Sequence, residues 1–87
     1  MAEILIYTSA LCGFCYSAKR LFADKGVEFT EIDVTFGGKK RAEMSARAGG
    51  QTSVPQIWIG GEHIGGSDEL YALEADGRLD PLLKRPA

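Results

Sequence analysis

This chain of 87 residues contains four Gly-Gly pairs, and each pair lies where a pattern of apolar residues ends or changes its period. Glycine adopts backbone conformations that other residues avoid, so such pairs are typical of turns between helices and strands. The pairs therefore divide the chain into separate elements. They are Gly37-Gly38, Gly49-Gly50, Gly60-Gly61 and Gly65-Gly66.

The segments before the first pair predict a strand and a helix. Residues 4–7 are continuously apolar, which is typical of a central strand that is covered on both faces. Between residues 14 and 25 the apolar side chains follow helical spacing, and Gly26 is a typical C-terminal end for such a helix.

A second strand and a second helix follow. Residues 27–34 are rich in strand formers. The alternation of apolar and polar residues shifts by one position between Phe29 and Ile32, which predicts a bulge or an edge strand. Residues 39–48 contain good helix formers. The weak apolar stripe of this helix consists of Ala42, Met44 and Ala48.

The remaining residues predict a hairpin and two helices. Residues 56–59 and 62–64 flank Gly60-Gly61, which favours two antiparallel strands joined by a two-residue turn. Ser67 is expected to be the N-cap of a third helix that Gly77 ends. Asp80-Pro81 predicts a short last helix. The order β-α-β-α-β-β-α-α predicts an α/β fold with a four-stranded mixed sheet flanked by helices, whose first unit is a right-handed parallel βαβ.

Length and charge narrow the class of protein. The chain is long enough for one domain, residues 1–87, with a modest core. The formal net charge is −2 and the longest basic run is Lys39-Lys40-Arg41, so we expect no nucleic-acid partner. The N-terminal apolar stretch is too short for a signal peptide and no segment approaches membrane-spanning length. We therefore expect a cytoplasmic monomer without a membrane partner.

Cys12-Gly13-Phe14-Cys15 holds both cysteines of the chain, between the first strand and the first helix. Two thiols at this spacing and in this context predict a redox pair. If the helix begins at or just after Cys12, its N–H groups and dipole converge on that sulfur and should lower its pKa. We therefore predict that Cys12 is the attacking thiolate and Cys15 the resolving thiol.

Three other interpretations of the cysteines compete with this one. A structural disulfide would close a loop too small to constrain an unfolded chain much. A zinc site needs about four ligands, and His63 is the single histidine. Two buried, inert thiols fit poorly with the polar, Gly-containing surroundings of the pair. The composition alone does not exclude any of the three.

Three separated motifs give the chain a close resemblance to the glutaredoxins, above all to their small bacterial dithiol members. They are Cys12-Gly13-Phe14-Cys15, Val54-Pro55 before the third strand, and Gly65-Gly66-Ser67-Asp68 before the third helix. The C-terminal segments of residues 69–73 and 79–83 also resemble the corresponding segments of these members. The resemblance implies a thioredoxin-like fold and a glutathione-dependent thiol–disulfide oxidoreductase, which reduces protein–glutathione mixed disulfides and protein disulfides.

The resemblance also implies a glutathione site with glutathione as reductant. Val54-Pro55 matches the family's threonine-valine-cis-proline, with Ser53 replacing the threonine, and the Val54 backbone would pair with the cysteinyl part of glutathione. Gly66, Ser67 and Asp68 would receive the γ-glutamyl group, its carboxylate on free N–H groups and its ammonium on Asp68. A trans proline and simple helix capping explain the same residues without a ligand.

Other positions are implied by the resemblance in the same way. Arg41 matches the residue that meets the glycyl carboxylate, while Tyr7 and Phe14 would form walls beside the sulfur. For Arg41 a solvated helix face and for Tyr7 a plain core role remain alternatives. We interpret His63 as structural or exposed, and Trp58 as a core residue.

Some residues depart from the family pattern. Gly13 and Phe14 stand where dithiol members have proline and tyrosine, and Ser9 stands where a lysine is common. The Cys-Gly-Phe prefix also occurs in monothiol members that carry iron-sulfur clusters, although those have serine where this chain has Cys15. A 2Fe-2S cluster shared between the Cys12 thiolates of two chains and two glutathiones is therefore an alternative function. A thioredoxin-type reductant fed by a reductase is another.

Overall fold

The computed structural model describes residues 1–86 and contains the eight elements in the predicted order. The strands are β1 (Ile4–Thr8), β2 (Thr30–Asp33), β3 (Gln56–Ile59) and β4 (Glu62–Gly65). The helices are α1 (Gly13–Asp24), α2 (Gly38–Arg47), α3 (Ser67–Ala75) and α4 (Leu79–Leu83). None of the helices within residues 1–86 has the length and apolar character needed to cross a membrane.

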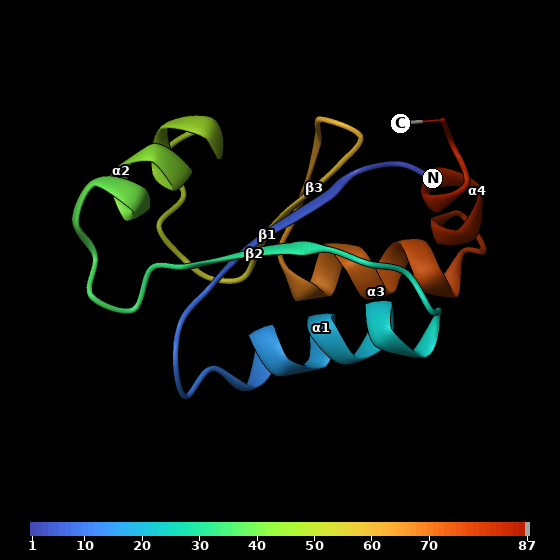
Figure 1. Ribbon diagram of the computed structural model, residues 1–87, viewed down its shortest axis with the longest axis horizontal. Coiled ribbons are helices and arrows are strands. Elements are labelled where there is room, and N and C mark those ends of the chain that lie inside the picture. The colour runs from blue at the N-terminus through green and yellow to red at the C-terminus, as the bar shows by residue number, and fades with distance from the viewer. Residues whose placement is uncertain (87) are drawn as a thin grey trace.

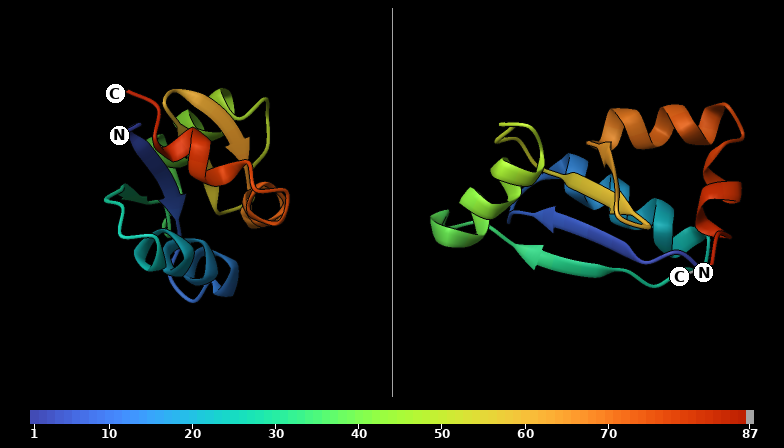
Figure 2. Two further views of the ribbon diagram at one scale, coloured as in Figure 1. Left: turned by 90° about the vertical axis from the view of Figure 1, so that its right-hand side faces the viewer. Right: turned by 90° about the horizontal axis from the view of Figure 1, so that it is seen from above.

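The four strands form one mixed sheet in the order β2-β1-β3-β4. β1 pairs in parallel with β2 and antiparallel with β3, and β3 pairs antiparallel with β4. Helices α1 and α3 run side by side along one face of the sheet, and α2 lies on the opposite face, as Figures 1 and 2 show. The predicted thioredoxin-like arrangement, a four-stranded mixed sheet flanked by helices, is confirmed.

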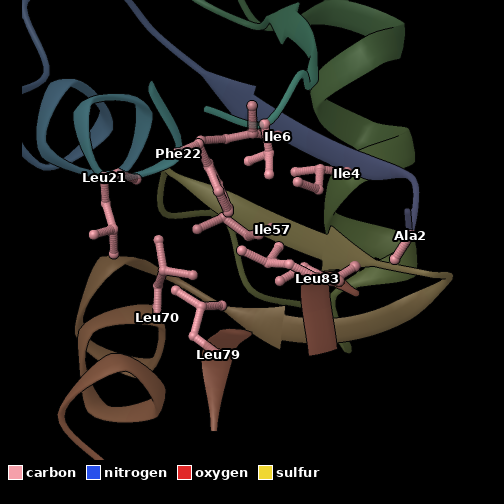
Figure 3. Packing of buried hydrophobic residues seen from close by; sticks show 12 residues of the cluster. Ala2, Ile4, Ile6, Leu21, Phe22, Ile57, Leu70, Leu79 and Leu83 are labelled. Carbon is pink, nitrogen blue, oxygen red and sulfur yellow. The ribbon is translucent and has the colours of Figure 1, made fainter. Parts of the chain in front are cut away.

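The larger core fills the space between the sheet and helices α1, α3 and α4 (Figure 3). Because side chains alternate along a strand, Ile6 of β1 and Ile57 of β3 point to this face, and both are fully buried. Phe22 of α1 and Leu70 of α3 meet them from the helices and are also fully buried. The expectation that residues 4–7 form a covered central strand is confirmed.

A second, smaller core occupies the α2 face of the sheet. Tyr7 of β1 and Trp58 of β3 meet there edge to face, with ring centroids 5.4 Å apart. Met44 and Ala48 of α2 cover them and are buried. Ala42, which the apolar stripe of this helix included, is exposed, so that part of the prediction was wrong. The buried face of α2 is therefore narrower than the stripe that included Ala42 predicted.

Strand β2 is shorter than the predicted strand over residues 27–34 and comprises only Thr30–Asp33. It lies at one edge of the sheet, which confirms the edge position that the shifted alternation of its apolar residues indicated. The irregular register lies elsewhere, between Ile57 and Trp58 where β3 pairs with β4. At the hairpin, Gly60 and Gly61 have φ angles of 59° and 81°, the left-handed conformation that a two-residue turn of this kind requires.

An ion pair links α1 to β2 and makes stability depend on pH. The Glu31 carboxylate accepts hydrogen bonds from Lys19 Nζ at 2.8 Å and from Thr8 Oγ1 at 2.6 Å. These contacts, with Lys19 first and Thr8 second, hold the pKa of Glu31 below its ordinary value. A group with a lowered folded pKa stabilises the fold above its unfolded pKa, about 4.3 for glutamate, and loses that contribution as the pH falls.

We therefore expect Glu31→Gln to lower the free energy of unfolding at neutral pH by less than about 1 kcal/mol, because both partners are partly exposed. The difference from the unmodified protein should shrink between neutral pH and about pH 3, because the stabilisation is lost as the pH falls toward the lowered pKa of folded Glu31. Urea unfolding at the two pH values measures it. Glu28→Gln is the control, since Glu28 is exposed and forms no ion pair within residues 1–86. A pH-independent difference would contradict the expectation.

Candidate functional site

Cys12 and Cys15 lie where the loop after β1 enters α1. Cys12 is the N-cap of the helix, and its sulfur accepts a hydrogen bond from the backbone N–H of Cys15 at 3.1 Å. Cys12 is half-buried, whereas the Cys15 side chain is only 1% exposed. A donor and the positive end of the helix dipole thus meet at the accessible sulfur, which favours the negative charge of a thiolate there.

The environment of Cys15 has the opposite effect. Burial raises the pKa of the Cys15 thiol to about 12, and the hydrogen bond and charge of Cys12 contribute further to the rise. Cys15 therefore stays protonated at neutral pH while Cys12 remains accessible. This difference fits the predicted division into an attacking and a resolving sulfur.

Leu11, directly before Cys12, has a left-handed backbone with φ of 58°, and its side chain is fully exposed at 106%. The left-handed conformation costs a residue with a β-carbon about 1–2 kcal/mol, whereas glycine adopts it freely. A fully exposed side chain contributes no packing to offset this strain.

We therefore expect Leu11→Gly to raise the free energy of unfolding by about 0.5–1 kcal/mol, the relieved strain less the extra entropy that glycine loses on folding. Phe36→Gly is the matched control, because Phe36 is 99% exposed without a positive φ. That control should lower stability. Urea unfolding of both variants measures the effect, and a loss of stability in Leu11→Gly equal to that in the control would contradict it.

The loop before β3 brings Val54 to the cysteines. The Val54-Pro55 peptide bond is cis, the form that the family motif implied. The Cys12 thiol points at the Val54 carbonyl oxygen, with Sγ 3.9 Å away. Two segments separated by 42 positions in the chain therefore meet at the accessible sulfur.

The turn from β4 into α3 approaches the same loop because glycines occupy it. A β-carbon on Gly66 would lie 3.3 Å from the Pro55 carbonyl oxygen, a tight contact. Gly65 has φ of 114°, and a β-carbon there would lie 2.6 Å from Glu69 Oε1. A side chain at Gly66 would therefore press the start of α3 away from Pro55, whereas one at Gly65 would be strained by its positive φ and would displace the Glu69 carboxylate.

The start of α3 differs by one residue from the prediction. Gly66 is the N-cap, and its N–H donates to Glu69 Oε1 at 2.6 Å. Ser67, predicted as the N-cap, is the first residue of the helix and is buried. The acidic side chain at the third position of the helix thus satisfies the N-cap N–H, one half of a capping box.

A pocket of about 320 Å³ lies between the start of α1, the loop before β3 and the start of α3. Seven of the predicted glutathione-site residues line it, which is the outcome that their positions in the three motifs implied. They are Phe14, Ser53, Val54, Pro55, Gly66, Ser67 and Asp68. Cys12 is not among the residues that line this pocket, but its sulfur lies 3.9 Å from the carbonyl oxygen of Val54, which does line it.

Two predicted site residues lie elsewhere. Tyr7 is 2% exposed and belongs to the second core, so the structure favours the core role over the wall beside the sulfur. Arg41 does not line the pocket. Its guanidinium donates to the carbonyl oxygens of Thr52 at 2.8 Å and Val34 at 3.3 Å, and so ties α2 to the loop before β3.

Three residues near the cysteines were not among the predicted site residues. Gln51 and Glu69 line the pocket, and Lys19 borders a second hollow of about 380 Å³ around the two thiols. Helical spacing would have indicated Lys19, because it follows Cys15 by one turn. The capping-box spacing from Gly66 would have indicated Glu69. Gln51 carried no such signal.

A larger hollow lies away from this site. It measures about 540 Å³ and lies at the amino-terminal end of β1, between residues 1–4 and 26–30, whereas the cysteines follow the carboxyl end of that strand. It contains no cysteine or histidine. The chemistry of the thiols therefore identifies the smaller pocket beside Cys12 as the candidate site.

Comparison with known proteins gives the same assignment. The family model described as Glutaredoxin matches residues 4–64. The chain is 52% identical over 84 residues to glutaredoxin 3 of Escherichia coli, covering 97% of this chain and 100% of that protein. It is 52% identical over 83 residues to a glutaredoxin of Pseudomonas aeruginosa, covering 95% of this chain and 98% of the relative.

Solved structures agree in both fold and sequence. The solution structure of glutaredoxin from Brucella melitensis is 51% identical, has a TM-score of 0.83, and is matched over 97% of this chain and 90% of that one. A crystal structure of a buckwheat glutaredoxin–glutathione complex is 32% identical with a TM-score of 0.84, over 94% of this chain and 76% of that one. The chain therefore belongs to the glutaredoxin family of glutathione-dependent thiol–disulfide oxidoreductases, and Cys12 and Cys15 are its Cys-x-x-Cys pair.

Proposed function

We propose that the pocket beside Cys12 binds glutathione, and that the protein reduces protein–glutathione mixed disulfides through Cys12 and protein disulfides through Cys12 and Cys15. The observation that carries this proposal is the convergence of three segments on one accessible sulfur. The start of α1, the Val54-Pro55 loop and the start of α3 line a single pocket that adjoins Cys12.

The pocket offers a separate partner for each end of the γ-glutamyl group. The N–H groups of Ser67 and Asp68 begin α3 and have no acceptor within the helix, so they suit a carboxylate. The N–H of Gly66 is already donated to Glu69, so it is not part of this proposal. The exposed carboxylate of Asp68 lies at the same helix end and suits the ammonium group.

The middle and the far end of glutathione would lie against the loop before β3. The backbone of Val54 precedes β3 and suits strand-like pairing with the cysteinyl residue. Arg41 uses two of its five N–H donors on carbonyl oxygens, and its remaining donors would receive the glycyl carboxylate from the α2 side. Phe14 would cover the pocket as an apolar wall, since it is 66% exposed in the protein alone.

The proposed reaction consists of two thiol–disulfide exchanges. The Cys12 thiolate attacks the glutathione sulfur of a mixed disulfide, the new bond joins Cys12 to glutathione, and the protein thiolate leaves and takes a proton. A second glutathione thiolate then attacks the bound glutathione sulfur, which forms glutathione disulfide and returns Cys12 to its thiolate.

For a protein disulfide, Cys12 first forms a mixed disulfide with the protein. Cys15 then attacks the Cys12 sulfur, the Cys12–Cys15 disulfide forms, and the protein thiolate leaves with the proton of Cys15. Two glutathiones reduce the Cys12–Cys15 disulfide and are released as glutathione disulfide.

Replacing Cys15 tests this division of roles. With a glutathionylated peptide as substrate and glutathione in excess, we expect Cys15→Ser to keep at least about half of the activity, because the monothiol route uses Cys12 alone. With a protein disulfide as substrate, the same variant should lose its activity, because no resolving thiol remains. Loss of both activities would contradict the proposed monothiol route, and inactivity of the unmodified protein with glutathione would contradict the proposed function.

A second candidate function is the binding of a 2Fe-2S cluster, which one observation favours. Cys12 is accessible and Cys15 is buried, so each chain presents one thiolate, as a cluster shared by two chains and two glutathiones requires. Among residues 1–86, no three His, Cys, Asp or Glu side chains lie close enough to hold a metal ion, so one chain would not suffice. An absorbance spectrum of anaerobically purified protein with glutathione tests this, because a ligated cluster absorbs visible light and a dithiol does not.

A further inference from the structure

Gln56, the first residue of β3, is a buried amide directly behind the wall of the pocket. Its side chain is 1% exposed, and both of its polar atoms have partners. The two N–H groups of Nε2 share three acceptors, which are Gln51 Oε1 at 3.2 Å, the Ser53 carbonyl oxygen at 3.1 Å and Ser53 Oγ at 3.3 Å. Oε1 lies 2.7 Å from His63 Nε2 on β4. A buried polar group with this many partners orders the groups around it.

The partners determine which way the amide points. A carbonyl oxygen only accepts hydrogen bonds, so the amide nitrogen of Gln56 must face Ser53 and its oxygen must face His63. His63 Nε2 therefore donates to Gln56. The neutral ring with a proton on Nε2 and the imidazolium both make this bond, so it persists whether or not His63 is charged.

His63 is itself held by the second core. Its ring lies 4.8 Å from the Trp58 ring with an interplanar angle of 32°, and the two residues pair across β3 and β4. The Arg47 guanidinium lies 4.8 Å from the Trp58 ring and donates to Tyr7 Oη at 3.3 Å. The position of His63 is thus set by aromatic packing on the α2 face of the sheet, where Tyr7 and Trp58 are buried.

The other side of Gln56 contacts a segment without regular structure. Gln51 and Ser53 both line the pocket, are exposed, and belong to the loop over residues 51–55. This loop also contains Val54, whose carbonyl oxygen faces the Cys12 thiol. The Gln51 N–H donates to the Ala48 carbonyl oxygen at 3.3 Å, and otherwise side-chain contacts such as those of Gln56 and Arg41 hold the loop in shape.

We infer that Gln56 is a positioning residue of this site: it ties the pocket wall at Gln51 and Ser53 to His63 and the second core, and so holds the glutathione-binding surface in place. The inference rests on the proposed function of the pocket. It makes the affinity for glutathionylated substrate depend on an amide that does not line the pocket. The reacting sulfurs do not depend on Gln56, because Cys12 and Cys15 are held by α1.

The test compares kcat and KM for a glutathionylated peptide in two variants of Gln56. Gln56→Met keeps the length of the side chain and removes both the amide nitrogen and the amide oxygen. Gln56→Glu keeps an acceptor for His63 and loses the donors to Gln51 and Ser53. We expect each to raise KM about fivefold to tenfold with kcat within about twofold, because the pocket wall loses the buried donor that ties it to β3. Amide hydrogen exchange should accelerate at Ser53 and Val54, but not in β1.

Two further variants complete the test. His63→Phe keeps the stacking on Trp58 and removes only the hydrogen bond to Gln56 Oε1. We therefore expect a smaller rise in KM, about twofold to threefold. Glu62→Met is the control, because Glu62 is exposed and lies beside His63 on β4. Among residues 1–86, its side chain has Arg85 as its one ion-pair and hydrogen-bond partner. Its KM should not change.

An unchanged KM in both Gln56 variants would overturn the inference, and so would a fall in kcat at constant KM, which indicates general loss of folded protein. If Gln56→Met does not fold, Gln56→Glu and His63→Phe decide by the same criteria. Inactivity of the unmodified protein with glutathione would instead overturn the proposed function. The two failures are therefore distinguishable.

Discussion

Cys12→Ser should reduce glutathione-dependent activity by about a thousandfold or more, to the uncatalysed rate, with every disulfide substrate. The N-cap position directs the Cys15 N–H to the sulfur, but a serine hydroxyl there does not ionise at neutral pH and forms no disulfide. Cys15 cannot replace Cys12 as the attacking thiolate, because it is buried and its pKa is raised to about 12. The coupled oxidation of glutathione measures the loss.

The fold should survive this substitution. Serine is among the preferred N-cap residues, so Cys12→Ser preserves the start of α1 and should change the melting temperature little. Circular dichroism melting of the variant and of the unmodified protein provides the control. Activity retained in Cys12→Ser but lost in Cys15→Ser would reverse the assignment of the two sulfurs and contradict the proposed mechanism.

Asp68→Asn should raise the KM for glutathionylated substrate about tenfold and leave kcat nearly unchanged. The carboxylate lies in the first turn of α3 and lines the pocket, where the proposed ligand places an ammonium group. A tenfold change corresponds to about 1.4 kcal/mol, between the value of an exposed ion pair and that of a buried charge-assisted hydrogen bond. The side chain does not touch the reacting sulfurs, so the effect belongs to binding.

Asp76→Asn is the matched control for this prediction. Asp76 caps the other end of α3, is exposed, and does not line the pocket. The same loss of one negative charge there should leave the KM unchanged. Steady-state kinetics of both variants at one ionic strength measures the contribution of the Asp68 charge to substrate binding. The rise in KM for Asp68→Asn is then measured at several salt concentrations. Equal effects of the two substitutions would indicate net charge rather than a contact, and would contradict the proposed role of Asp68.

The order of the elements could be predicted because its signals are local. The continuous apolar run of residues 4–7, the helical spacing that Gly26 ends and the Gly60-Gly61 turn each depend on neighbours only a few positions away. The same holds for the redox pair. A helix that begins at Cys12 places a donor at one sulfur and buries the other one turn later, as the contacts of Cys12 and Cys15 show.

Other features depended on segments far apart in the chain and could not be predicted from local patterns. Ala42 fitted an apolar stripe, yet α2 covers only part of the sheet and leaves Ala42 exposed. Ser67 looked like an N-cap, but the Glu69 side chain satisfies the preceding N–H and moves the helix start. Tyr7 fitted both a pocket wall and a core residue, and its contact with Trp58 decided for the core.

By itself, the sequence determined the elements, their order and the pair of thiols, since periodicity, turn residues and helix ends act over a few positions. Only the tertiary structure decided which side chains share a pocket and which share a core. Cys12 meets Val54 across 42 positions, and Gln56 joins the pocket wall to His63 on the neighbouring strand. Such contacts follow from the pairing of strands and the packing of helices on a sheet, which no single segment contains.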